Sequence, residues 1–440
     1  MKFLDKSKIN LKELWLLFIT FAIPLVGVGG ASALPYRLRI PLIYSIGIAL
    51  VLAFVLTDIK ISFNPPNLIF ATLLTYIGIT MPFSLHQETT MSLFLIYLSC
   101  FPLLFLNLSL DNTQKIVSVI YIFCLVIAIS IFISVPIDQC MNRFFWFIVN
   151  PSRAANVAAK MQKQLNLGGF AGFAVDIGEA AFIMNSGVAI SFADYFAKGH
   201  FTKKNLLSTL AFLVALTLTG KRTYFIVAII CFFAFMIVSR VKGKIFKISA
   251  TLLLAIVAVF FIVMFIPSMA NIFYRLADVE NISDMGGRDS LWKYVYMMID
   301  EFPVFGGGFG AYNEYAYVHG MRTYDQRWDY NAHNSYLQVL GELGVVGFSL
   351  VILFMVTTLI ITIRLIRKLS AREDKNVNLL YYSMYIQIMT MVYSLTGNPL
   401  YTKQYILTWI FAIGVMLNLY GREKEKKSPP RLTAEFNKFV

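Results

Sequence analysis

The sequence predicts an all-α integral membrane protein that crosses the bilayer with about twelve transmembrane helices. Of its 440 residues, 58% are hydrophobic and only 14% are charged. A soluble chain carries roughly 25% charged residues, because its surface faces water. Apolar runs at 14–30, 40–57, 115–136, 248–266 and 348–363 approach the roughly 20 residues that cross a bilayer core. They lack the polar stripe of a soluble helix, so we expect them to face lipid.

Polar residues separate the candidate spans. The spans lie near 11–30, 40–57, 68–83, 91–108, 115–136, 177–197, 205–220, 223–238, 246–266, 344–363, 378–396 and 403–420. Segment 2–13 is polar and the run after it is long enough to cross, so we expect that run to be the first helix and not a cleaved signal peptide. The four cysteines show no Cys-x-x-Cys spacing, and neither a disulfide framework nor a zinc site is expected.

Basic residues are unevenly distributed between the loops, and cytoplasmic loops are the ones that collect Lys and Arg. Placing both termini inside puts the loops near 198–204, 240–247 and 364–377 in the cytoplasm, with most of the 38 basic residues. The +14 net charge is then mainly a topology signal, and a nucleic-acid partner is not expected. The predicted organisation begins with a block of spans over 1–266, which includes an outer basic loop at 137–176. A large extracytoplasmic loop follows at 267–343, then the last three spans over 344–420 and a basic cytoplasmic tail at 421–440.

Arginine outnumbers lysine among the outer basic residues, whereas lysine predominates inside. Topology needs only charge, so the outer arginines point to binding of phosphate or carboxylate by the forked guanidinium group. Arg222, with Lys221 beside it, lies at the outer junction of two spans. Such a pair either binds an anion or snorkels to the membrane interface.

The large outer loop contains a turn, Gly286-Gly287-Arg288, that leads into an expected helix. Arg288 would lie at the helix N-terminus, where unpaired N–H groups and the helix dipole favour an anion. The alternative is an exposed arginine of a first helical turn. Further along, Gly306, Gly308 and Gly310 form a glycine-rich stretch without the Lys-Ser/Thr of a phosphate loop, which favours a tight structural turn.

A second helix is expected to begin near Asn331, with His333 in its first turn. The helix dipole would oppose a positive imidazole there, and a neutral histidine can accept a proton. The alternative is a hydrogen-bonded scaffold histidine. The loop is also rich in tyrosine, whose amphipathic ring suits sugars as well as membrane interfaces.

These motifs follow one another in a particular order. The order is Arg222 at an outer helix junction, Gly-Gly-Arg288 with Trp292, Pro303 with Gly306, Gly308 and Gly310, and Ala-His333-Asn334 with Leu337, Glu342 and Gly344. Together with the predicted topology, this order resembles the O-antigen ligase and Wzy-type polysaccharide polymerase superfamily of polytopic membrane glycosyltransferases.

The resemblance implies metal-independent glycosyl transfer, with no cofactor, from a glycan on undecaprenyl diphosphate at the periplasmic face of a bacterial inner membrane, as in lipopolysaccharide and cell-envelope synthesis. It implies that Arg222 and Arg288 hold the diphosphate and that His333 helps to deprotonate the acceptor hydroxyl. The wider substrate-binding set is Arg288, Arg222, Arg153, Lys221, Asn334, Tyr336, Trp292, Gly306 and Gly308. The lipid bilayer and a chain-length regulator are further expected partners.

Three functions remain open at this point. In a polymerase the acceptor is another lipid-linked repeat unit, and in a ligase it is the lipid A-core. The outer basic loop, in which Gly168-Gly169 follow Arg153, resembles a basic loop of the polymerases and therefore favours a polymerase. A polysaccharide or lipid-linked sugar transporter is disfavoured, because such proteins place ionisable residues at mid-membrane depth and these spans are nearly free of them. Segment 31–40 has no carboxylate, which disfavours metal-dependent membrane glycosyltransferases.

Overall fold

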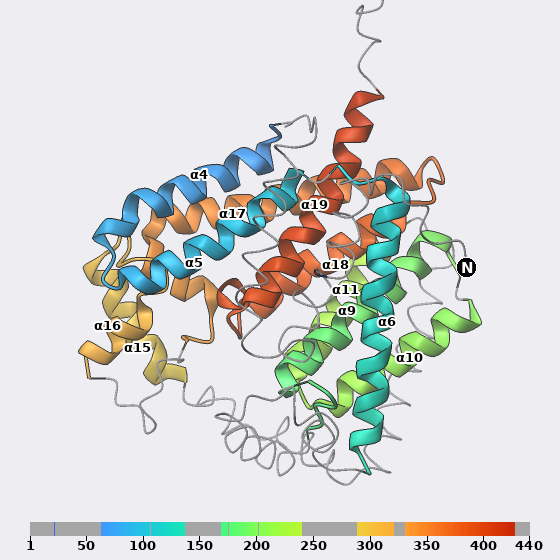
Figure 1. Ribbon diagram of the computed structural model, residues 1–440, viewed down its shortest axis with the longest axis horizontal. Helices are drawn as coiled ribbons and strands as arrows, with labels where there is room; N and C mark the ends of the chain where they lie inside the picture. The colour runs from blue at the N-terminus through green and yellow to red at the C-terminus, as the bar shows by residue number, and fades with distance from the viewer. Residues whose placement is uncertain are drawn as a thin grey trace, which may run out of the picture.

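The computed structural model describes residues 22, 63–105, 107–136, 169–174, 176–200, 202–239, 288–320 and 331–426. Every regular element within these ranges is helical, as the sequence predicts (Figure 1). The elements are α4 (Pro65–Thr80), η2 (Met81–Phe83), α5 (Gln87–Cys100), η3 (Phe101–Phe105), α6 (Leu110–Ser134), α9 (Ile177–Lys198), α10 (Lys203–Leu218), α11 (Arg222–Val238), α15 (Arg288–Glu301), α16 (Tyr312–Val318), α17 (Ser335–Ser370), α18 (Val377–Tyr393), η4 (Pro399–Tyr401) and α19 (Lys403–Glu425).

Each predicted span that falls on described residues corresponds to a helix. Six helical segments there are long and apolar enough to cross a membrane: Pro65–Phe83, Gln87–Phe105, Leu110–Ser134, Ile177–Lys198, Ser335–Ser370 and Lys403–Glu425. The predicted spans at 11–30, 40–57 and 246–266 lie outside the described residues. The outer loop at 137–176 and the first part of the loop at 267–343 lie mostly outside them as well.

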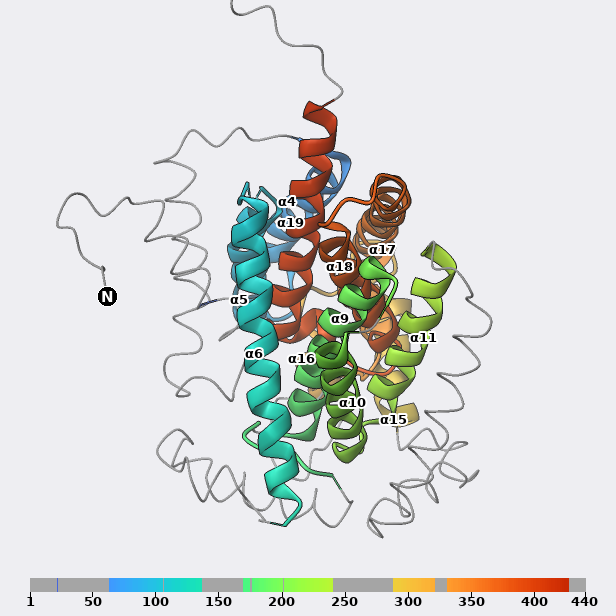
Figure 2. The same ribbon diagram turned by 90° about the vertical axis from the view of Figure 1, so that its right-hand side faces the viewer.

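The centre of the bundle is α9, which is surrounded by α6, α10, α11 and α18 (Figure 2). Most of its residues are buried, whereas α4, α6 and α17 each keep an apolar face exposed. Asp176 caps the start of α9 by accepting hydrogen bonds from the backbone N–H groups of Gly178 (2.7 Å) and Glu179 (2.9 Å). Gly199 ends the helix in the left-handed conformation, with φ of +75°.

The longest of the described helices, α17, is kinked at Gly344, where φ is +62° and ψ is −173°. The kink leaves the carbonyl oxygen of Leu343 available, and the Tyr76 hydroxyl of α4 donates to it at 2.7 Å. The backbone of Val304 packs so closely on Gly344 that a side chain there would overlap with it. The kink therefore brings the segment that follows α15 against α17, and it separates the start of α17 from the part that the sequence predicts as a span at 344–363.

Candidate functional site

The starts of α11, α15 and α17 meet at one end of the bundle, and each carries a basic residue singled out in the sequence. His333, just before α17, interacts electrostatically with Arg288 at the start of α15 and with Lys221 at the cap of α11. Arg222 is the first residue of α11. More than 60 residues separate Lys221 from Arg288 in the chain. The fold thus brings Lys221, Arg288 and His333 together, with Arg222 following Lys221 in the chain. Arg153 lies outside the described residues.

His333 is exposed and adopts a left-handed backbone conformation with φ of +52°, which is uncommon for a residue other than glycine. The expectation that it lies in the first helical turn is wrong, because α17 begins at Ser335 with Asn334 as its cap. Desolvation by the surrounding protein lowers the pKa of His333 from its ordinary value, and the positive charges of Arg288 and Lys221 lower it further. The imidazole is therefore neutral near pH 7 and able to accept a proton.

Arg288 is half-buried at the start of α15 and has no ion-pair partner among the described residues. Its guanidinium group also interacts electrostatically with Tyr393, at the end of α18. A partly desolvated arginine at a helix N-terminus, with no ion pair to a described carboxylate, is well placed to bind an anion. Beside it, Lys221 is exposed, and its side chain lies near Gly178 at the start of α9.

Trp292, Asn334 and Tyr336 use their polar atoms to hold the segment that carries His333. The indole N–H of Trp292 donates to the carbonyl oxygen of Ala332 at 2.9 Å. The side-chain oxygen of Asn334 accepts from the N–H groups of Tyr336 (3.1 Å) and Leu337 (3.2 Å). The Tyr336 hydroxyl donates to the carbonyl oxygen of Met391 at 2.8 Å. In this arrangement all three side chains orient the backbone around His333.

The glycine-rich stretch is held by Glu342, which is fully buried on α17. Its carboxylate accepts hydrogen bonds from the backbone N–H groups of Gly310 (2.7 Å) and Tyr312 (3.0 Å) and from the Tyr401 hydroxyl (2.7 Å). The side-chain amide of Gln338 supplies a fourth bond at 3.0 Å. A buried carboxylate is stable only when such donors surround it.

Gly306 and Gly308 have φ values of +73° and +113°. A side chain at Gly306 would overlap with the backbone of Glu342, and one at Gly308 would overlap with Ser84. The N–H of Gly308 donates to the carbonyl oxygen of Glu342 at 2.9 Å. These glycines allow the loop to pack directly on α17, which agrees with the tight structural turn favoured by the sequence.

The buried side-chain amide of Gln338 also connects the His333 segment to the link between α18 and α19. Its side-chain oxygen accepts from the N–H of Ala332 (3.1 Å) and from the side-chain amide of Asn398 (2.7 Å). Ser335 donates its hydroxyl to the carbonyl oxygen of Gly397 at 3.0 Å. The two ends of the His333 segment are thus fixed to parts of the chain that are distant in sequence.

The sequence does not reveal a group of tyrosines and an aspartate beside these cations. The ring centroids of Tyr224 and Tyr393 lie 4.5 Å apart, and those of Tyr393 and Tyr405 lie 5.8 Å apart. Asp176 interacts electrostatically with both Tyr393 and Tyr405. These residues come from α9, α11, α18 and α19, and no local motif joins them. No cluster of His, Cys, Asp and Glu residues able to hold a metal ion occurs in the ranges that the structure describes.

The fold and this site define a polytopic helical membrane protein in which Lys221, Arg288 and His333 meet at one end of the bundle. Residues 207–352 match the family model described as O-antigen ligase. The match confirms the resemblance that the motifs indicate, and it runs from α10 to the middle of α17, with Lys221, Arg288 and His333 inside it. No curated protein matches the chain.

Proposed function

We propose that the protein transfers a glycan from a polyprenyl-diphosphate carrier, such as undecaprenyl diphosphate, to a hydroxyl group of an acceptor glycan. The observation that carries the proposal is the meeting of Arg288 and Lys221 with a His333 whose pKa is lowered. An anion-binding group and a neutral base side by side are what displacement of a diphosphate by an alcohol requires. The family match over residues 207–352 supports lipid-linked glycan as the substrate class.

In the proposed reaction the acceptor oxygen attacks the anomeric carbon of the donor sugar. A new glycosidic bond forms as the bond between that carbon and the phosphate oxygen breaks. The diphosphate leaves with the bonding electron pair, and Arg288, Arg222 and Lys221 stabilise its charge. His333 takes the acceptor proton. The residues of this chain would thereby supply both the electrostatic stabilisation and the base.

The remaining predicted site residues support this geometry in the proposal. Trp292, Asn334 and Tyr336 position His333 through the bonds described above. Gly306 and Gly308 shape the wall that packs on α17. Arg153 is kept as a substrate-binding candidate on the strength of the sequence alone.

The proposed acceptor is another lipid-linked repeat unit, which makes the protein a polysaccharide polymerase. A ligase that uses lipid A-core as acceptor is the second candidate, favoured by the description of the matching family. In both cases we place the site on the outer side of the bacterial inner membrane, with both termini in the cytoplasm, as the distribution of basic residues predicts.

The two candidates differ in what the purified protein makes from lipid-linked repeat units. A polymerase lengthens the glycan when the donor is the only substrate, whereas a ligase forms product only when lipid A-core is added. Arg288→Ala and His333→Ala serve as inactive controls. Absence of product under both conditions, from a folded protein supplied with its cognate repeat unit, would contradict the proposed function.

A further inference from the structure

A polar cavity lies at the end of the bundle opposite the candidate site. Both α9 and α18 connect the two ends: α9 runs from Asp176, near the candidate site, to Lys198 at the cavity, and α18 runs from the cavity to Tyr393. The 22 residues of α9 correspond to a separation of about 30 Å. The cavity has a volume of about 950 Å³, which is in the range of small-molecule sites. It is therefore separate from the residues assigned to glycan transfer.

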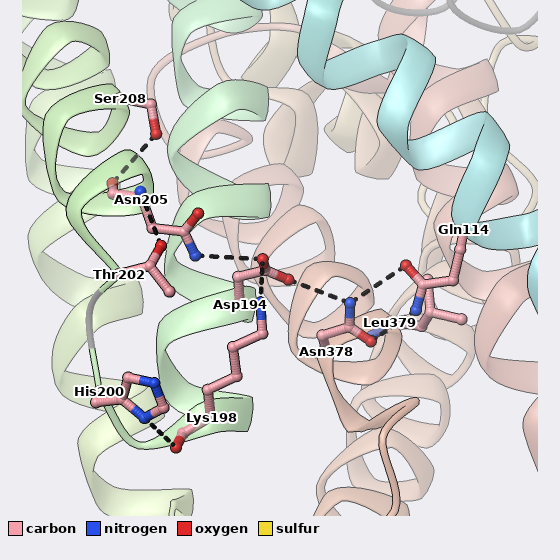
Figure 3. Close-up of polar contacts among 9 residues, drawn as sticks. All are labelled: Gln114, Asp194, Lys198, His200, Thr202, Asn205, Ser208, Asn378 and Leu379. Atoms are coloured by element: carbon pink, nitrogen blue, oxygen red, sulfur yellow. Dashed lines mark hydrogen bonds and ion pairs between the residues drawn. The ribbon is translucent and has the colours of Figure 1, made fainter.

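A network of amide groups around one carboxylate forms the polar wall of the cavity (Figure 3). Asp194 accepts hydrogen bonds from the side-chain amides of Asn205 (3.2 Å) and Asn378 (3.3 Å), and from the Lys198 ammonium group (3.0 Å). Gln114 donates to the side-chain oxygen of Asn378 at 2.8 Å. These contacts join α6, α9, α10 and α18, so the amide groups are fixed in place before any ligand arrives.

Two hydroxyl groups of the cavity lining have no hydrogen-bond partner among the described residues. Ser191 on α9 is only 2% exposed, and its Oγ has no hydrogen bond within the described part of the chain. The same is true of the buried hydroxyl oxygen of Tyr121 on α6. Each of these oxygens exposes less than 1 Å². Burying a hydroxyl without a partner costs roughly 1–3 kcal/mol, so a ligand toward which these side chains turn would recover that cost.

The charges around the cavity nearly cancel. The basic residues that line it are Lys198, Lys204 and Lys375, and the acidic ones are Asp111, Asp194, Glu373 and Asp374. The ion pair with Lys198 already balances Asp194. The Lys204 ammonium group lies 6.0 Å from the centre of the Tyr121 ring. A near-neutral wall rich in amides and hydroxyls disfavours a strongly charged ligand and suits a molecule that both donates and accepts many hydrogen bonds.

We propose that this cavity binds a neutral carbohydrate, with the hydroxyls of Ser191 and Tyr121 and the amides around Asp194 as its hydrogen-bond partners. Tyr121 also offers an aromatic face with a polar edge, which suits a sugar ring. The predicted topology places this site in the cytoplasm. The inference concerns a second binding site and does not depend on the proposed transfer reaction.

The test measures binding of D-glucose, N-acetyl-D-glucosamine and maltotriose to the full chain in lipid nanodiscs, free of sugar-based detergent, by saturation-transfer NMR and calorimetry. Glucose 6-phosphate and glucosamine serve as charged counterparts. Ser191→Ala and Tyr121→Phe each remove one unpaired oxygen and preserve the packing. Each should weaken binding of a neutral sugar about three- to tenfold, the effect of one hydrogen bond, without lowering the thermal midpoint.

Matched controls come from the same helix and from a similar side chain. Ser186 of α9 is buried with its hydroxyl bonded to the carbonyl oxygen of Phe182 (3.0 Å), and Tyr382 has an unpaired buried hydroxyl; neither lines the cavity. Ser186→Ala and Tyr382→Phe should leave the affinity unchanged. The inference is overturned if no neutral sugar binds, if only a charged counterpart binds, or if binding survives in Ser191→Ala and Tyr121→Phe but is lost in Arg288→Ala, which would place the sugar at the other end.

Discussion

Trp292 on α15 donates its indole N–H to the carbonyl oxygen of Ala332 at 2.9 Å, one residue before His333. This bond connects the helix that begins with Arg288 to the segment that carries His333. Ala332 is held on its other side by the side-chain oxygen of Gln338, which accepts from the Ala332 N–H at 3.1 Å. The distance between the proposed anion-binding residue and the proposed base therefore depends on Trp292.

Trp292→Phe keeps an aromatic ring but removes this N–H group. We expect kcat to fall about fivefold with KM little changed, because one net hydrogen bond is worth about 1 kcal/mol and its loss frees the backbone next to His333. Steady-state kinetics of the purified protein measure both constants. Tyr296→Phe, on the exposed side of the same helix, is the control. An unchanged kcat in Trp292→Phe would show that the bond is dispensable.

Glu342 should be important for stability rather than for chemistry. In Glu342→Ala the N–H groups of Gly310 and Tyr312 and the hydroxyl of Tyr401 lose their acceptor, at a cost of about 3 kcal/mol or more. We expect a large fall in the thermal midpoint and in abundance. Glu342→Gln keeps one acceptor oxygen and should be intermediate. Glu314→Ala, on the neighbouring helix α16, should be neutral, and equal stability of all three variants would refute the role of Glu342.

The pH dependence of the reaction should report on His333. Its pKa lies below the ordinary value, so the neutral base is fully present near pH 7 and is lost only as the pH falls through that lowered pKa. Activity should therefore be level around neutrality and decline in acid. Lys221→Gln removes one of the charges that lower this pKa, and the acid limb should move to higher pH. A limb that stays in place in Lys221→Gln would contradict the assignment of His333 as the base.

Apolar runs predicted the helices well, because lipid-facing spans are recognised from composition alone. The resemblance implied that Arg222, Arg288 and His333 act on one reaction. The structure shows that His333 interacts with Arg288 and with Lys221, the residue before Arg222. The start of α17 was misplaced because Asn334, and not Asn331, provides the oxygen that caps the helix. Both residues are plausible caps in sequence, and only the tertiary contacts of Ala332 and Ser335 decide between them.

The parts of the site that the sequence could not predict depend on contacts between residues far apart in the chain. Tyr393 lies near Arg288 although about 100 residues separate them, and Asn398 reaches Gln338 from the link before α19. Glu342 belongs to the sequence motif, but its four hydrogen-bond donors come from three separate segments and could not be predicted from it. The hydrogen-bond network around Asp194 likewise combines residues of four helices, and these residues form no local sequence pattern.

The sequence predicts that transfer continues in the presence of a chelator, because the resemblance implies a reaction that Arg and His residues perform without metal. Product formation from lipid-linked repeat units should be equal, within error, with EDTA and with added Mg²⁺. The assay needs a metal-dependent membrane glycosyltransferase as a positive control for chelation. Loss of product in EDTA that a divalent ion restores would contradict the proposed mechanism.

In the proposed reaction Arg288 binds the diphosphate through its planar guanidinium group. An ammonium group cannot reproduce that two-bond geometry, so Lys should not replace Arg288 even though the charge is kept. Loss of one contact to a developing charge is worth roughly 3 kcal/mol, or about a hundredfold in rate. Arg364→Lys, an exposed position near the far end of α17, is the matched control and should be fully active.

The most direct measurement is the rate at which the Arg288→Lys protein forms product from a lipid-linked repeat unit. Its abundance and thermal midpoint must first be shown to match those of the unmodified protein. The account predicts a fall of about a hundredfold, with Arg288→Ala and His333→Ala at least as impaired. A stable Arg288→Lys protein with a rate close to that of the unmodified protein would contradict it.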